Sequence, residues 1–294
     1  MDEVRILEIK QSVFANNDQR AELLRRELKE KRIFLLNLMS SPGSGKTTTL
    51  TRTIERLRDE FKIGVMEADI DSDVDARTIA ATGVKSIQLH TGGMCHLDAD
   101  MTRQGLDGLA AGDVELAVLE NVGNLVCPAE FDTGAVKNAA ILSVPEGDDK
   151  PLKYPLMFQI CDVVLINKTD VLPYFDFDME KCRENIRMRN PNARVIPICA
   201  KTGEGVDEWA DWLRAEVKAW RGGTATAQRK DAGYERDTFP PGREQTALFH
   251  SKGRAAPGEN FKAGAYDHRP HSRQAARPDG GRPGILGPGG RGDG

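Results

Sequence analysis

A glycine-rich segment that ends in lysine and threonine has the spacing of a phosphate-binding loop. It runs from Ser40 to Thr48 and reads Ser-Ser-Pro-Gly-Ser-Gly-Lys-Thr-Thr. Glycines let backbone N–H groups converge on the β- and γ-phosphates of a nucleotide, and a following helix adds its positive end. The lysine reaches the phosphates, and the threonine hydroxyl ligates Mg²⁺. We therefore expect nucleotide phosphates to be bound by Gly43, Ser44, Gly45, Lys46, Thr47 and Thr48, with Thr47 also holding Mg²⁺.

One position departs from the usual G-x-x-x-x-G-K-[ST] pattern, because Ser40 replaces its first glycine. A chance glycine-rich turn is the alternative interpretation. An apolar strand candidate, Ile33–Met39, precedes the loop and a helical pattern follows it. This strand–loop–helix context favours the phosphate loop.

Two later segments carry residue types that recognise guanine. Asn167-Lys168-Thr169-Asp170 directly follows an apolar strand candidate, and Cys199-Ala200-Lys201-Thr202-Gly203 follows another. A carboxylate at Asp170 can accept hydrogen bonds from guanine N1–H and the exocyclic amine, which adenine does not offer in that arrangement. An isolated N-K-x-D is a weak signal, but its place after a phosphate loop and before Cys-Ala-Lys favours GTP. The predicted base-binding residues are Asn167, Lys168, Asp170, Ala200 and Lys201.

Two cysteines and a histidine could bind a transition metal. Cys95 and His96 are adjacent, and the preceding Gly92-Gly93 favours a loop in which both side chains turn toward one ion. Cys127 is the third donor; thiolate and imidazole suit Zn²⁺ and Ni²⁺ alike. Three ligands leave a four-coordinate ion one short, so water, substrate or a second subunit would complete the site. The alternative is that Cys95 and Cys127 are ordinary buried thiols.

Strand and helix patterns alternate from residue 33 onward, which predicts a three-layer α/β fold of the phosphate-loop NTPase type with a mostly parallel central sheet. The strand candidates are Ile33–Met39, Lys62–Glu67, Ser86–His90, Glu115–Glu120, Ala139–Val144, Asp162–Asn167 and Arg194–Cys199. The helical patterns are Thr47–Glu60, Ala99–Ala110, Asp178–Asn190 and Val206–Arg221.

Three regions follow from these patterns. Residues 1–30 read as an N-terminal helical segment, and residues 31–221 as the nucleotide-binding domain with inserted metal-binding loops. Residues 222–294 contain 15 glycines and 7 prolines but few apolar residues, with 12 Lys/Arg against 8 Asp/Glu. Such a composition buries too little apolar surface to offset the entropy of ordering, so we expect a disordered tail.

Composition excludes several classes of protein. The 294 residues have a net charge of −4, which argues against a nucleic-acid binder. No apolar run is long enough for a membrane span, and the acidic start lacks the pattern of a secretory signal. Five cysteines at scattered spacings argue against a disulfide scaffold. We expect a cytoplasmic protein.

Three segments resemble one family of phosphate-loop GTPases. Glu120-Asn121-Val122-Gly123 stands where such GTPases carry D-x-x-G, and glutamate there is typical of the metal-centre assembly GTPases of the SIMIBI class. The longer run Glu120–Pro128 resembles the hydrogenase nickel-incorporation GTPases, HypB, as do Thr91–Ala99 and Val144–Pro151. The resemblance covers roughly residues 30–221.

The resemblance implies an enzyme that hydrolyses GTP to GDP and phosphate, forms a homodimer when GTP is bound, and helps deliver Ni²⁺ to an apo [NiFe]-hydrogenase large subunit. It also implies a small nickel-binding partner, HypA. The chain departs from some relatives because its N-terminus has no Cys-rich nickel motif and it has no dense His-rich segment.

The resemblance also assigns roles around the phosphates. Asp69 and Asp75 match acids of a switch segment near Mg²⁺, with Asp69 as a further Mg²⁺ ligand; the alternative is a solvated acidic loop that caps a helix. Glu120 would sense the γ-phosphate, directly or through Mg²⁺-bound water. Lys46 and Mg²⁺ would carry most of the catalysis. Cys127 is only seven positions after Glu120, so the state of the nucleotide could reshape the metal site.

Three alternatives remain at this point. A urease-type nickel-assembly GTPase shares the phosphate loop and N-K-T-D, but its usual Cys-Pro-His motif is absent. A phosphotransferase also uses a phosphate loop, although N-K-x-D and E-x-x-G argue against it. A metal-binding module could keep GTP only as a structural ligand, in which case nickel transfer would be equal with GTP and GDP.

Overall fold

The computed structural model describes residues 5–8, 17–69 and 74–222, and all that follows concerns these ranges. The strands are β1 (Arg5–Glu8), β2 (Phe34–Ser40), β3 (Ile63–Asp69), β4 (Lys85–His90), β5 (Leu116–Glu120), β6 (Lys137–Ser143), β7 (Val163–Asn167) and β8 (Arg194–Pro197). The longer helices are α1 (Asn17–Glu30), α2 (Lys46–Leu57), α4 (Ala99–Gly108), α8 (Met179–Arg189) and α9 (Val206–Gly222). The shorter ones are α3 (Val74–Ala80), α5 (Cys127–Glu130), α6 (Lys150–Lys153) and α7 (Pro155–Ile160), with 3₁₀ turns at η2 (Ala111–Asp113), η3 (Val144–Glu146) and η4 (Thr169–Tyr174).

The described strands form one sheet in the order β1-β4-β3-β5-β2-β6-β7-β8, and every neighbouring pair is parallel. In such a sheet the carboxyl ends of all strands meet along one edge, where ligands of open α/β folds bind. β2 lies in the middle, so the loop that follows it is flanked by loops from both halves of the sheet.

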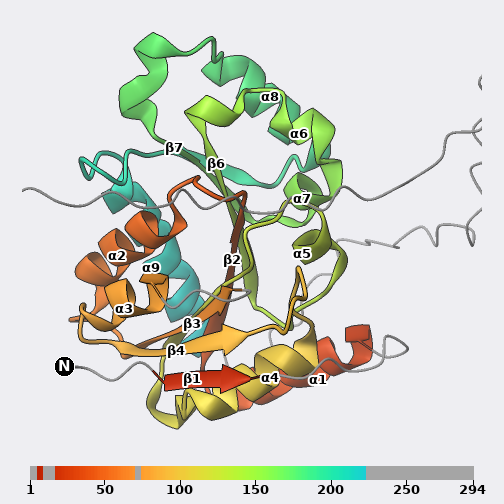
Figure 1. Ribbon diagram of the computed structural model, residues 1–294, viewed down its shortest axis with the longest axis vertical. Helices are drawn as coiled ribbons and strands as arrows, with labels where there is room; N and C mark the ends of the chain where they lie inside the picture. The colour runs from red at the N-terminus through yellow and green to blue at the C-terminus, as the bar shows by residue number, and fades with distance from the viewer. Residues whose placement is uncertain (1–4, 9–16, 70–73, 223–294) are drawn as a thin grey trace, which may run out of the picture. The chain divides into compact units, whose positions relative to one another are not determined.

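Helices cover both faces of the sheet (Figure 1), and the alternation within β2 shows how the strands meet them. Phe34, Leu36 and Leu38 pack with residues of α2 and α9. Leu35 points to the other face and packs with residues of α1 and α4. A third apolar cluster joins β6 and β7 to α7 and α8. Because both faces are buried, the strands read as continuous apolar runs. The predicted three-layer fold is confirmed.

The N-terminal segment corrects one prediction. Residues 17–30 form the expected helix, but Arg5–Glu8 are not helical: they form β1, which pairs in parallel with β4. The free edge of β4 offers backbone partners to a short extended segment, and this tertiary pairing overrides a weak local pattern. Helix α1 also belongs to the domain's core, because its Leu24 and Leu28 are buried against the sheet.

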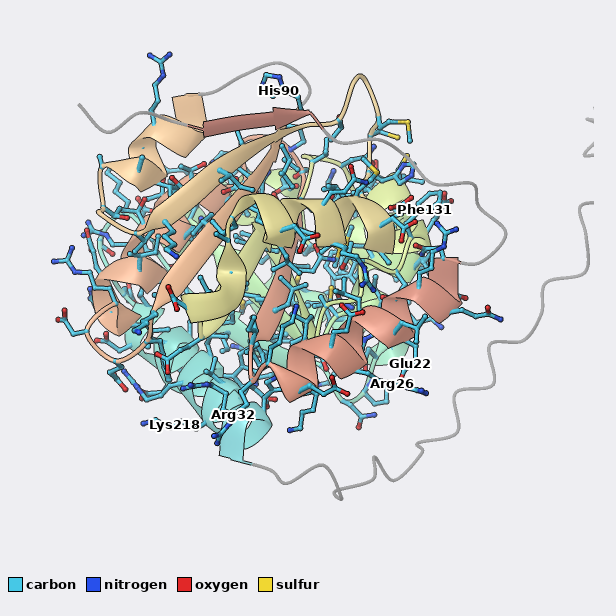
Figure 2. The ribbon with its side chains drawn as sticks, turned by 90° about the horizontal axis from the view of Figure 1, so that it is seen from below. Glu22, Arg26, Arg32, His90, Phe131 and Lys218 are labelled. Atoms are coloured by element: carbon cyan, nitrogen blue, oxygen red, sulfur yellow. The ribbon has the colours of Figure 1, made fainter. Side chains whose placement is uncertain are left out.

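Ion pairs fasten α1 to neighbouring elements. Arg25 pairs with Asp132, and Arg103 of α4 lies 2.6 Å from Glu27. By contrast, Glu22 and Arg26 lie on the outer face of the helix (Figure 2), where an ion pair adds little stability. The described helices include none that is long and apolar enough to cross a bilayer. The predicted tail from residue 222 onward lies, apart from Gly222, outside the described residues.

Candidate nucleotide and metal site

The phosphate loop joins the end of β2 to the start of α2, at the carboxyl edge of the sheet. Gly43 and Gly45 have φ angles of +75° and +100°, which L-residues with a side chain rarely adopt. A Cβ atom on Gly45 would also lie 2.5 Å from the side-chain nitrogen of Asn167. Glycine is therefore required at position 45 by both the backbone turn and the closeness of its neighbour.

The contacts of Ser40 show what a serine does at the position where such loops usually have their first glycine. The residue is fully buried at the end of β2, and its hydroxyl accepts a hydrogen bond from Lys46 Nζ at 3.1 Å. The same hydroxyl donates to the carbonyl of Ser41 at 2.8 Å. Ser40 thus holds the lysine that would bind the phosphates. Sequence reasoning recorded this residue only as a departure from the pattern.

The predicted base-binding residues meet the phosphate loop. Asn167 donates to the carbonyl of Ser44 at 2.8 Å and accepts from the backbone N–H of Ala200 at 3.1 Å. Lys168 Nζ donates to the carbonyl of Gly43 at 2.7 Å. One buried side chain, Asn167, therefore connects all three predicted nucleotide-binding segments. Asp170 and Lys201 are exposed to solvent, and Thr47 and Thr48 lie in the first turn of α2.

Glu146 is a residue of this site that sequence reasoning missed. Its carboxylate accepts a hydrogen bond from the hydroxyl of Ser41 in the phosphate loop. Its other oxygen accepts from the backbone N–H and the hydroxyl of Ser143, both at 2.7 Å, in a capping box at η3. The Ser143-x-x-Glu146 spacing is a local signal for that cap, but nothing local indicates the contact with Ser41.

Acidic residues lie at or near the carboxyl ends of β5 and β3, the first and second strands on one side of β2. Glu120 ends β5 and is 3% exposed; Glu67 in β3 is its register partner and equally buried. Glu67 had not been predicted as a site residue. Asp69 ends β3 and Asp75 lies in α3, but the placement of their side chains falls outside the described residues. Their predicted roles near Mg²⁺ stay predictions.

The two predicted thiol ligands lie together although they come from different loops. Cys95 follows β4 and Cys127 begins α5. The Cys127 thiol is near enough to raise the pKa of the Cys95 thiol, with burial as a second cause. Asn124 Nδ2 lies 3.5 Å from Cys127 Sγ. The loop expected after Gly92-Gly93 is present, and both glycines have positive φ angles.

His96, the third predicted ligand, is a buried imidazole. It is 5% exposed, and its ring stacks on Phe131 with centroids 3.6 Å apart. Burial lowers its pKa, while the nearby carboxylates of Asp98 and Glu130 act in the opposite direction. Nδ1 lies 3.9 Å from Cys95 Sγ, and Nε2 has no hydrogen-bond partner. A neutral imidazole with an unused nitrogen is the form that binds metals.

Within the ranges that the structure describes, no three His, Cys, Asp or Glu side chains stand in a geometry that would hold a metal ion. Cys95 lies close to His96 and close to Cys127, but the three predicted ligands do not surround one point.

The other cysteines, Cys161, Cys182 and Cys199, are buried. Burial raises the pKa of Cys182 to about 12, so this thiol stays protonated. His90 ends β4, away from Phe131 (Figure 2).

Comparison with known proteins agrees with this geometry. Residues 34–197 match the family model described as "CobW/HypB/UreG, nucleotide-binding domain". The fold and site therefore define a phosphate-loop nucleotide-binding domain of that class. A curated relative, the hydrogenase maturation factor HypB of Azotobacter chroococcum mcd 1, is 47% identical over 79% of this chain and 78% of its own length. The chain belongs to the HypB family of hydrogenase maturation factors.

Two solved structures of the family have the same fold. HypB from Helicobacter pylori, crystallised in complex with nickel, is 36% identical, with a TM-score of 0.66 over 69% of this chain and 96% of that one. HypB from Archaeoglobus fulgidus is 39% identical, with a TM-score of 0.65 over 69% of this chain and all of that one.

Proposed function

We propose that this chain is a GTP-hydrolysing nickel metallochaperone of the cytoplasm, which assists insertion of Ni²⁺ into an apo [NiFe]-hydrogenase large subunit. It dimerises when GTP is bound, and it receives or passes on nickel with the accessory protein HypA. The observation that carries the proposal is the pairing of Cys95 with Cys127, because Cys127 lies on the segment that begins at Glu120 beside the phosphate loop. The nickel-bound Helicobacter pylori relative supports the choice of metal.

The residues at the phosphate loop suit GTP and its hydrolysis. The hydrogen bond from Lys46 Nζ to the hydroxyl of Ser40 holds the lysine charge at the phosphate loop before a nucleotide binds. Asp170 would select guanine, and Asn167 fixes the distance between base-binding and phosphate-binding segments. Thr47 and Asp69 would hold Mg²⁺, whose charge neutralises the phosphate oxygens. Hydrolysis then depends on positioning and charge, with Glu120 beside the γ-phosphate.

The residues at the second site suit a nickel ion as cargo. Thiolate and imidazole donors accept Ni²⁺, and Zn²⁺ competes for the same ligands. The pairwise arrangement of Cys95, His96 and Cys127 leaves the ligand set incomplete in one chain. A second copy of the chain would complete it, which couples nickel binding to dimerisation.

The test is a paired titration. Ni²⁺ is titrated into the full chain with GDP and with a non-hydrolysable GTP analogue, and light scattering reports dimerisation in the same samples. We expect nickel affinity and dimer fraction to differ between the two nucleotides. Cys127→Ala should abolish the nickel response and Cys182→Ala should keep it, because the Cys182 thiol is buried in α8.

Equal nickel affinity in both nucleotide states would instead favour a metal-binding module that keeps GTP as a structural ligand. Delivery is tested separately, by loading the chain with nickel and following transfer to the apo large subunit with and without HypA. Transfer that is faster with GTP than with the non-hydrolysable analogue would support a chaperone that hydrolysis drives. Transfer to apo-urease alone would favour the urease-type alternative.

A further inference from the structure

Three asparagines, two of them buried and the third half-buried, are linked by hydrogen bonds across the middle of the sheet. Asn121 Nδ2 donates to Asn37 Oδ1 at 3.0 Å, and Asn37 Nδ2 donates to Asn138 Oδ1 at 3.0 Å. Asn121 follows β5, Asn37 lies in β2 and Asn138 lies in β6. Asn37 is 2% exposed and Asn121 is fully buried. An amide in such a place costs free energy unless its hydrogen bonds are made, and here they are.

Backbone groups at both ends of this hydrogen-bond network fix which amide atom donates and which accepts. The N–H of Val122 donates to Asn121 Oδ1 at 2.9 Å, and Asn138 Nδ2 donates to the carbonyl of Ile160 at 3.4 Å. A backbone N–H can only donate and a carbonyl can only accept, so each amide has one permitted orientation. The oxygen of Asn37 must therefore face Asn121. Removing this oxygen takes away the side-chain bond of Asn121 to β2 and leaves only the backbone bond from the N–H of Asn121 to the carbonyl of Leu38, at 2.9 Å.

The segment that follows Asn121 lies between the phosphate loop and the Cys127 thiol. Gly123 packs so closely on the phosphate loop that an added Cβ would lie 3.2 Å from Pro42 and 3.4 Å from Lys46 Nζ. One residue further, Asn124 approaches Cys127 Sγ at 3.5 Å. A displacement of Asn121 would thus be felt both at the lysine and at the thiol.

The apolar strand itself does not require an asparagine. Position 37 stands between Leu36 and Leu38, where leucine has nearly the same shape and no hydrogen bonds to satisfy. We infer that Asn37 is a positioning residue: through Asn121 it fixes the segment 121–127, so that the state of the nucleotide is passed to the Cys127 thiol. This inference rests on the proposed function, but the position of the segment can be tested without it.

The first test is hydrogen–deuterium exchange in the nucleotide-free full chain. We expect Asn37→Leu to speed exchange in peptides that cover residues 121–127 by roughly tenfold, since a lost hydrogen bond opens the segment. Asn190→Leu is the matched control, because Asn190 makes part-buried bonds to the carbonyls of Gln159 and Cys161, which are far from residues 121–127 in the sequence. Unchanged exchange over 121–127 in Asn37→Leu would overturn the inference, whatever the chain's function.

The second test is the ratio of Ni²⁺ affinities with the GTP analogue and with GDP. In Asn37→Leu we expect this ratio to move toward one by about fivefold or more, while GDP affinity changes less than about threefold. Asn138→Leu leaves the bond between Asn37 and Asn121 in place and should keep the wild-type ratio. An equal loss in Asn37→Leu and Asn138→Leu would show a general structural effect and refute a positioning role. A wild-type ratio of one would refute the proposed coupling itself, and the exchange experiment would still decide the role of Asn37.

Discussion

Replacing Gly45 by alanine should lower the free energy of unfolding in two ways, which a comparison with Gly43→Ala can separate. The first is backbone strain, because Gly45 has a φ of +100°; a side chain in the left-handed region costs about 1 to 2 kcal/mol. The second is the approach of the new Cβ to within 2.5 Å of Asn167 Nδ2, which forces that side chain to move. Asn167 then loses its bonds to Ser44 and Ala200.

The two lost bonds are worth about 1 to 1.5 kcal/mol each. Together with the strain, Gly45→Ala is expected to lower the free energy of unfolding by about 3 to 5 kcal/mol. Gly43→Ala is the matched control: Gly43 also has a positive φ, of +75°, but an added Cβ would meet nothing within 4 Å. It should cost only the strain, about 1 to 2 kcal/mol.

Urea denaturation of the nucleotide-free chain measures both variants, with tryptophan fluorescence, to which the buried Trp209 contributes, as the probe. The side chain of Trp209 donates to Thr53 of α2 at 2.8 Å, so it reports on the helix that begins at the phosphate loop. In an Asn167→Ala background, Gly45→Ala should cost no more than Gly43→Ala, because no amide remains to be displaced. Equal losses for the two glycine variants in the wild-type background would refute this reasoning.

Three further outcomes can be checked directly. Glu146→Ala should lower the free energy of unfolding by about 1 to 3 kcal/mol, since it removes the acceptor of three hydrogen bonds, and urea denaturation measures the loss. The Arg214 guanidinium lowers the pKa of the exposed Glu60 below its usual value of 4.5, so this pair's contribution is present above pH 4.5 and is lost as pH falls through the lowered pKa. Glu60→Gln should therefore flatten the fall of stability on the acid side, and an unchanged acid limb in thermal melts would count against the pair. Iodoacetamide should alkylate Cys95 and Cys127 but not the three buried cysteines, and Ni²⁺ should protect both; mass spectrometry of the labelled peptides reads the pattern.

The sheet was largely predictable from sequence because its central strands are buried on both faces. Continuous apolar runs placed the predicted strands 62–67 and 115–120 close to the observed β3 and β5. The four-residue β1 was missed because so short a segment has no periodicity of its own. The same reason hid the short helices α5, α6 and α7, which no pattern had indicated.

The site was predictable where chemistry depends on local spacing. The phosphate loop and N-K-x-D were recognised from consecutive residues, and Asn167 does meet the phosphate loop. Ser40 bonds to Lys46 within the same loop, whereas Glu146 and Asn37 bond to segments far away in the sequence; a single sequence gives no signal for any of these contacts. The pairing of Cys95 with Cys127 was anticipated from residue types, but the contact itself follows from strand order.

The strand order places the loops predicted to bind guanine and the loops that carry the two thiols on opposite sides of β2. The loops predicted to read guanine follow β7 and β8, on one side of it, while the loops with the two thiols follow β4 and β5, on the other. Mutations on one flank can therefore accumulate without disturbing contacts on the other. Under the proposed function, this separation would let the metal-binding loops change their ligands while the nucleotide-binding loops keep theirs.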